Sequence, residues 1–316
     1  MNFPVFDLHC DTVSKLVGED LKGGMSLLRN DQHIDLERAA TLPGYAQCFA
    51  FWSTTDMHLP KGLKVTDLFW REVSALQDEL DKNSDIIRQA RSAADVRRNF
   101  EQGLMSAIFT LEGPAGIEFD PGKLEKLYNL GFRISTLGWN ELNCLTGSHV
   151  TGGGLTKRGR EYVKECQRLG ILVDVSHISD EAFWQIMDMT EKPVIASHSN
   201  SRSVWDNSRN LTDDMFKAIC ATGGVAGFNL CPPFVAEEPN LDHCCDHILR
   251  LLELDPDGTH VALGGDLDGI SSTPADFDGV QDYPKIAQRL LERGLDDKTV
   301  KNIFWNNALG VMECCI

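Results

Sequence analysis

Histidine and carboxylate residues end several of the short apolar runs in this chain. His9 and Asp11 close the first run, Glu112 closes a later one, and His177 and His198 close two more. Imidazole nitrogen and carboxylate oxygen are ligands that zinc and similar divalent ions accept, and five are more than one catalytic ion with an open position requires. Two ions that share one carboxylate would use all five. We therefore predict a metal centre, because five such residues at corresponding places are hard to explain as separate hydrogen-bonded core residues.

Eight apolar runs could carry these residues as β-strands. They cover residues 5–9, 46–52, 105–112, 133–137, 171–177, 194–198, 224–230 and 261–266. Amphipathic helical patterns lie between and after them, at residues 67–80, 123–129, 158–169, 180–189, 212–220, 242–252 and 300–312. Such alternation indicates a parallel sheet covered by helices, and eight repeats favour a closed (β/α)8 barrel of the TIM type over an open doubly wound sheet. The active site of such a barrel lies at the carboxyl ends of its strands, where the candidate ligands fall.

Side-chain alternation orients the polar residues at the strand ends. Successive side chains in a strand point to opposite faces, so we expect His9 and Asp11 on one side, with Asp7 one step deeper. Asp266 ends the last predicted strand and adds a further carboxylate. The mouth of the predicted barrel is therefore expected to carry both imidazole and carboxylate groups.

Length and composition bound the class of protein. The 316 residues fit one barrel, so residues 1–316 are predicted to form a single domain. A hydrophobic fraction of 42% is typical of a folded globular protein, and a net charge of −17 argues against nucleic acid or an anionic membrane surface as a partner. No apolar run approaches the roughly 18 residues of a membrane span, and neither a leader nor a lipid-anchor motif is visible, so we expect a cytoplasmic protein. The ten scattered cysteines are expected to be reduced thiols.

The order of the motifs resembles the membrane dipeptidase family, also called renal dipeptidases, which are dizinc barrel peptidases. The resemblance covers nearly the whole chain. It rests on His-x-Asp at 9–11, Thr-Leu-Glu-Gly at 110–113, Val-Asp-Val-Ser-His at 173–177, Pro-Val-Ile-Ala-Ser-His-Ser at 193–199, Arg-Asn at 209–210 and Gly-Gly-Asp-Leu-Asp-Gly at 264–269. It implies hydrolysis of dipeptides, with those that carry a C-terminal D-residue among the candidates, by a homodimer.

The resemblance also implies a role for each predicted ligand. His9 and Asp11 would bind the first zinc ion, His177 and His198 the second, and Glu112 would bridge the two. The implied reaction is attack on the peptide carbonyl by a hydroxide held between the metals, which also polarise that carbonyl.

Three further residues match positions of the family that act on the substrate. Arg209 corresponds to the arginine that takes the substrate carboxylate, a role that suits a guanidinium fork. Asp266 corresponds to the aspartate that carries the proton to the leaving amine. Trp139 stands where many members have a histidine that holds the substrate carbonyl oxygen. An indole nitrogen can donate a hydrogen bond but cannot carry a charge, so we expect Trp139 to contact substrate and to alter substrate preference.

Alternatives stay open at this point. Another metal-dependent hydrolase of the amidohydrolase kind, a deaminase or cyclic amidase, typically begins with His-x-His, whereas this chain has His-x-Asp. Trp139 would also suit a catalytically silent barrel that binds a metal or small ligand. The presence of Asp266 and Arg209 argues against such a barrel.

His243 and His247 lie four residues apart and could form a metal pair. Without a third ligand, they predict an exposed or interface helix instead.

Overall fold

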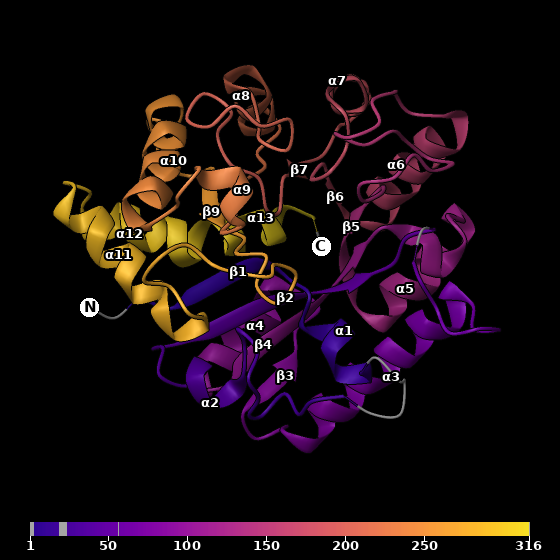
Figure 1. Ribbon diagram of the computed structural model, residues 1–316, viewed down its shortest axis with the longest axis horizontal. Coiled ribbons are helices and arrows are strands. Elements are labelled where there is room, and N and C mark those ends of the chain that lie inside the picture. Colours follow the sequence, from indigo (N-terminus) through magenta and orange to yellow (C-terminus); the bar gives the residue numbers. More distant parts are fainter. Residues whose placement is uncertain (1–2, 19–23, 56, 316) are drawn as a thin grey trace.

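The strands lie at the centre of the molecule and the helices surround them (Figure 1). The computed structural model describes residues 3–18, 24–55 and 57–315. The strands are β1 (Val5–Cys10), β2 (Tyr45–Trp52), β3 (Ile87–Gln89), β4 (Met105–Glu112), β5 (Phe132–Thr136), β6 (Leu172–Asp174), β7 (Val194–Ile195), β8 (Ala226–Phe228) and β9 (Val261–Leu263). The α-helices are α1 (Thr12–Val17), α2 (Leu36–Ala39), α3 (Val65–Lys82), α4 (Ala93–Glu101), α5 (Leu124–Leu130), α6 (Lys157–Leu169), α7 (Asp180–Met187), α8 (Asp213–Ala221), α9 (Pro232–Val235), α10 (Leu241–Leu254), α11 (Tyr283–Glu292), α12 (Asp297–Lys301) and α13 (Asn307–Cys315).

Hydrogen bonding closes the sheet into a barrel. The strands follow the order β7-β6-β5-β4-β2-β1-β9-β8, and neighbours pair in parallel. An isolated parallel bridge between Ala196 and Ala226 joins the two ends of this path. The (β/α)8 TIM-type fold predicted from the sequence is therefore confirmed. β3 is absent from that prediction; it pairs with the first residues of β4, before the place where β5 joins the same strand.

Each predicted helical pattern corresponds to a helical segment, and the last one is α12 and α13 joined by the π-helical turn Asn302–Asn306. Hydroxyl side chains begin several of these helices: Thr156, Ser179 and Thr212 accept a backbone N–H in the first turn of α6, α7 and α8. Among the helices of the described residues, none offers the apolar length that crossing a bilayer takes.

Apolar side chains fill the interior of the barrel. Phe6 and Leu8 of β1 belong to the same buried cluster as Ile108 of β4 and Ile195 of β7. Trp305 packs against Phe6 with the ring centroids 5.8 Å apart, so the C-terminal helical segment covers the amino-terminal end of the barrel. Polar side chains are left for the opposite end, where the strands finish.

Four strands, β6, β7, β8 and β9, are shorter than predicted. β6, β7 and β9 end before the polar residues that were expected to close them, so His177, His198 and Asp266 lie in the loops that follow. His177 and Asp266 have φ angles of 71° and 59°. These angles belong to the left-handed region, which a β-strand cannot use. The loops, rather than strand alternation, therefore aim these side chains.

Candidate metal centre

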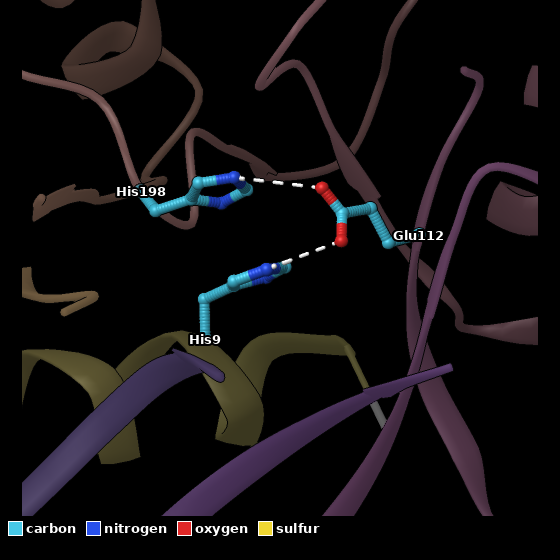
Figure 2. A group of neighbouring side chains, drawn as sticks. All are labelled: His9, Glu112 and His198. Atoms are coloured by element: carbon cyan, nitrogen blue, oxygen red, sulfur yellow. Dashed lines mark ion pairs between the residues drawn. The ribbon is translucent and has the colours of Figure 1, made fainter. Parts of the chain in front are cut away.

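Three histidines and one glutamate meet at the carboxyl ends of the strands. Oε2 of Glu112 lies 3.3 Å from His9 Nε2, and Oε1 lies 3.0 Å from His177 Nε2 and 3.8 Å from His198 Nε2. Figure 2 shows His9 and His198 facing different oxygens of Glu112. The Nε2 atoms of His177 and His198 are 2.8 Å apart, and the rings of His9 and His198 stack with centroids 3.7 Å apart. All four side chains are buried.

Two aspartates extend this cluster on the side of His9. Asp11 Oδ2 lies 3.4 Å and Asp266 Oδ1 lies 4.0 Å from His9 Nε2. Gly269 leaves the necessary space, because a Cβ atom there would stand 2.1 Å from Asp11 Oδ2 and 2.7 Å from Asp266 Oδ1. Asn229 Nδ2 donates to Asp266 Oδ2 at 3.1 Å. The fold thus brings all five predicted ligands and Asp266 to one place.

The donor set fits divalent cations. The ligand atoms of His9, Glu112 and His198 lie within 4.8 Å of one another, and so do those of His9, Asp11 and Asp266. His9 Nε2 and Asp11 Oδ1 are buried, and among the described residues neither atom has a hydrogen-bond partner. Buried polar atoms are costly when unpaired. A cation with a preference for nitrogen and oxygen ligands would pair both.

Burial and crowding shift the pKa values of these groups. Burial and the adjacent Asp11 carboxylate raise the pKa of Glu112 to about 8, and burial raises the pKa of Asp266 to about 6. Burial, together with nearby positive charges, lowers the pKa of His177 and His198. Both imidazoles are therefore neutral, which is the form that binds metal. A divalent cation would in turn favour the ionised form of Glu112.

A buried aspartate orients His198. Asp174 Oδ1 accepts from the backbone N–H groups of Ser176 at 3.0 Å and Ser197 at 2.9 Å. The Ser197 hydroxyl donates to the other Asp174 oxygen and lies 2.6 Å from His198 Nδ1. This hydroxyl can accept a hydrogen bond from Nδ1–H, which keeps the proton on Nδ1 and leaves the Nε2 lone pair free to face Glu112.

Asp7 was expected on the side of His9 and Asp11, one step deeper, but its carboxylate is directed to other partners. Its carboxylate accepts from the hydroxyl of Tyr283 on α11 and from the N–H groups of His9 and Gly265, both at 3.0 Å. The pairing of β1 with β2 shifts register between Asp7 and Cys10. This irregularity interrupts the alternation on which the prediction depended.

Arg209 is buried and has unused donors. Its exposed fraction is 3%. Nη1 donates to Ser199 Oγ at 2.7 Å, whereas no described residue accepts a hydrogen bond from Nε or Nη2. Its Cζ lies 5.8 Å from the ring centroid of Phe234, which lines the pocket beside the ligands; Arg209 itself is not among the lining residues. The free donors suit a carboxylate.

The pocket beside the ligands has a volume of about 590 Å³, within the range of small-molecule sites. Trp52, Trp139 and Phe234 give it an aromatic lining, and Glu112 and Asp266 line it as well. Trp139 packs edge-on against Trp52, with the ring centroids 5.2 Å apart at an interplanar angle of 76°. Trp139 therefore lies at the predicted site.

Two asparagines in this region were not predicted as site residues. Asn229 binds Asp266, and Asn140 contacts a ring nitrogen of His177. Asn140 stands four residues after β5, and Asn229 directly follows β8. A position near the carboxyl end of a strand is the available sequence signal, although loop asparagines are common for other reasons. His247, predicted on an exposed or interface helix, is fully buried instead. Its Nδ1 accepts from Ser201 N at 3.2 Å, and its Nε2 donates to a backbone carbonyl at 2.9 Å.

Comparison with known proteins places the chain in a family. The sequence profile of the family described as membrane dipeptidase (peptidase family M19) matches residues 1–315. The chain belongs to this family. The dipeptidase verJ of Clonostachys rogersoniana is 32% identical over 300 residues, which are 89% of this chain and 75% of that protein. An uncharacterized dipeptidase of Schizosaccharomyces pombe is 34% identical over 225 residues, 69% of this chain. The match spans 55% of that relative's length.

Solved structures share the fold of this membrane dipeptidase family member. A metallopeptidase from Rhodobacter sphaeroides, solved with a phosphinate mimic of the dipeptide L-Ala-D-Ala, aligns with a TM-score of 0.89 at 24% identity and covers 100% of both chains. The probable dipeptidase PvdM from Pseudomonas aeruginosa aligns with a TM-score of 0.88 at 18% identity, over 99% of this chain and 95% of its own. At these identities, the likeness establishes the fold.

Proposed function

We propose that this member of the membrane dipeptidase family hydrolyses dipeptides with two zinc ions per chain, bridged by Glu112. The observation that carries the proposal is the placement of the two Glu112 oxygens. Oε2 faces His9, beside Asp11, and Oε1 faces His177 and His198. Each Glu112 oxygen, together with the two residues beside it, would supply three ligands to one ion. Three ligands leave open positions on the ion for water and substrate.

The protein side chains would do the remaining work. Divalent ions held there supply a water that is acidic near neutral pH and polarise a carbonyl. Arg209 would bind the terminal carboxylate of the dipeptide, through its unpaired Nε and Nη2. Asp266 has a pKa near 6 and would accept a proton on Oδ1 and return it to the leaving amine. Asn229 would keep Oδ2 of Asp266 turned away by its hydrogen bond.

A hydrolysis panel of L-L and L-D dipeptides with zinc-loaded protein tests the proposal. Wild type should cleave some of them, and Asp266→Asn should keep its metal but lose about 10²- to 10⁴-fold in kcat, the usual contribution of a general acid–base group. Full metal loading without cleavage of any dipeptide would favour a silent barrel. Cleavage of cyclic amides alone would favour an amidohydrolase of another kind.

Metal content tests the bridge separately. Elemental analysis of wild type should give close to two ions per chain, and Glu112→Ala should lose more than one, because a bridging ligand serves both ions. Loss of a single ion, with the other unaffected, would contradict the bridging role.

Three further points remain predictions. The chain is expected to act as one catalytic domain, to form a homodimer and to work in the cytoplasm. Limited proteolysis, sedimentation of the purified protein and cell fractionation would check them in that order.

A further inference from the structure

We propose that Asn140 is a positioning residue for the metal ligand His177, as the centre of a hydrogen-bonded relay that reaches the segment of Arg209. The inference rests on the proposed metal centre. It assigns a role to Asn140, His149 and Ser208, three residues outside the ligand set.

His177 needs an external support for its ring. It lies in a turn with φ of 71°, beyond the end of β6, so strand alternation does not orient its side chain. Its Nδ1 lies 2.9 Å from Asn140 Oδ1, while its Nε2 faces Glu112. A histidine that binds metal through Nε2 must carry its proton on Nδ1, and an acceptor there fixes both the tautomer and the ring orientation. Asn140 Oδ1 is that acceptor.

The same oxygen receives a second hydrogen bond. His149 Nε2 lies 3.0 Å from Asn140 Oδ1, and His149 Nδ1 lies 3.0 Å from Ser208 Oγ. One assignment of hydrogens satisfies all three bonds. His177 Nδ1–H and His149 Nε2–H donate to the two lone pairs of Asn140 Oδ1, and the Ser208 hydroxyl donates to His149 Nδ1. Because Ser208 directly precedes Arg209 in the chain, the relay joins the metal ligand to the segment that carries the proposed carboxylate site.

Backbone contacts hold the relay in place. The N–H of His149 donates to the carbonyl of His177 at 2.8 Å, and the Ser148 hydroxyl donates to the carbonyl of Asn140 at 2.8 Å. His198 differs from His177, because its Nδ1 is oriented by Ser197 and Asp174. Of these two ligands, only His177 depends on the loop between β5 and α6.

Chelator competition and elemental analysis on the purified protein test the role. Asn140→Ala should weaken the binding of one of two zinc ions by about 10- to 100-fold, the usual effect of removing a partner of a metal-bound histidine. Asn140→Asp keeps an oxygen acceptor and should bind zinc nearly as wild type does. His149→Ala should weaken zinc binding less than Asn140→Ala, because it leaves the bond to His177 intact.

Asn143→Ala is the matched control in the same loop. The Asn143 side chain bonds to the carbonyl of Leu137 and the N–H groups of Leu145 and Thr146, and in the part of the chain that the structure describes it makes no hydrogen bond to His177. The Asn143→Ala variant should have a lower melting temperature than wild type and the same zinc affinity. Equal loss of zinc affinity in Asn143→Ala and Asn140→Ala, or wild-type affinity in Asn140→Ala, would overturn the inference. Failure of wild type to bind two ions would instead contradict the proposed function.

Discussion

At the scale of single residues, Arg209 stands out because no carboxylate of the described residues forms an ion pair with it. One nitrogen binds the Ser199 hydroxyl, and the other two have no hydrogen-bond partner in the described part of the chain, in a side chain that is 3% exposed. A buried guanidinium that makes no ion pair has lost its hydration without gaining a charged hydrogen-bond partner. A ligand that brings its own carboxylate restores the balance, and a dipeptide does so at its C-terminus.

C-terminal amidation of the substrate measures this contact. We expect amidated dipeptides to lose about 1.5 to 3 kcal/mol of transition-state binding, the worth of a hydrogen bond to a charged group, or about 10- to 150-fold in kcat/KM. In Arg209→Ala, the free and amidated forms should be equally poor substrates. Equal rates for both forms in wild type would show that Arg209 has another role.

Trp139 should set the size of the side chain that the pocket accepts. Its indole packs against Trp52, and its ring centroid lies 6.2 Å from that of His177. We expect Trp139→Ala to widen the pocket and to raise kcat/KM for dipeptides with bulky side chains relative to small ones. Trp184→Ala, on the surface of α7, is the control and should leave the ratio unchanged. An unchanged ratio in Trp139→Ala would place this residue outside the specificity pocket.

At the scale of elements, two buried aspartates tie neighbouring strand ends together in the same way. Asp7 on β1 accepts hydrogen bonds from the N–H of His9, two residues further along, and from the N–H of Gly265, which follows β9. Asp174 on β6 accepts hydrogen bonds from the N–H of Ser176, also two residues further along, and from the N–H of Ser197, which follows β7. In both places, a carboxylate binds backbone groups where the ladder ends. The loops that carry the ligands are thereby fixed to the barrel.

Removal of the Tyr283 hydroxyl tests the tie between α11 and β1. Tyr283 donates to the Asp7 carboxylate, whereas Tyr162, also fully buried, shares a hydrogen bond with the Ser135 hydroxyl. Tyr283→Phe should lower the free energy of unfolding by about 1.5 to 3 kcal/mol, and Tyr162→Phe by about 0.5 to 1.5 kcal/mol, because bonds to charged groups are stronger. Urea unfolding at pH 8 makes the comparison. A larger loss in Tyr162→Phe would contradict it.

Helix α3 carries a buried acid that should make stability depend on pH. Glu72 is 2% exposed, and its Oε2 has no hydrogen-bond partner within the described ranges of the chain. Burial, and to a lesser extent the charge of Asp11, raises its pKa well above the ordinary value of 4.5. The folded state therefore keeps a proton that the unfolded chain releases above pH 4.5, so this group costs stability as pH rises from there to the folded pKa.

Glu72→Gln removes this pH dependence. Near pH 4.5 the variant and wild type should differ little. At higher pH the variant should become more stable by about 1.4 kcal/mol for each pH unit, until the pKa of the folded form is reached. Urea midpoints of the two proteins at pH 5 and pH 8 give the result. A stability difference that is the same at both pH values would contradict the assigned protonation.

At the scale of the whole molecule, the proposed ligands connect distant parts of the barrel. They come from β1, from β4 and from the loops after β6 and β7, so metal binding would stabilise the closed ring of strands. A ligand that binds only the folded state adds about 4 kcal/mol when its concentration is 1,000 times its Kd. Chelation should therefore lower the melting temperature of wild type and change that of Glu112→Ala much less. Identical melting with and without chelator would argue against metals at this site.

The sequence was enough to predict the barrel and the place of the proposed ligands. Periodicity is a local property, so apolar strands and amphipathic helices could be recognised one by one, and a barrel puts every strand end at one mouth. His9, Asp11 and Glu112, at or next to the ends of long strands, were placed correctly by this argument. β3 was not predicted because a strand of three residues with one fully buried side chain shows no clear alternation of apolar and polar residues.

The contacts of the individual side chains could be known only from the three-dimensional structure. Asp7 accepts a hydrogen bond from Tyr283, which is 276 residues away in the chain, and no local sequence pattern could predict that partner. Asn140 meets His177 across 37 residues and His149 meets Ser208 across 59. Hydrogen bonds are directional and short in range, so their partners are settled only when loops from different parts of the barrel lie against one another.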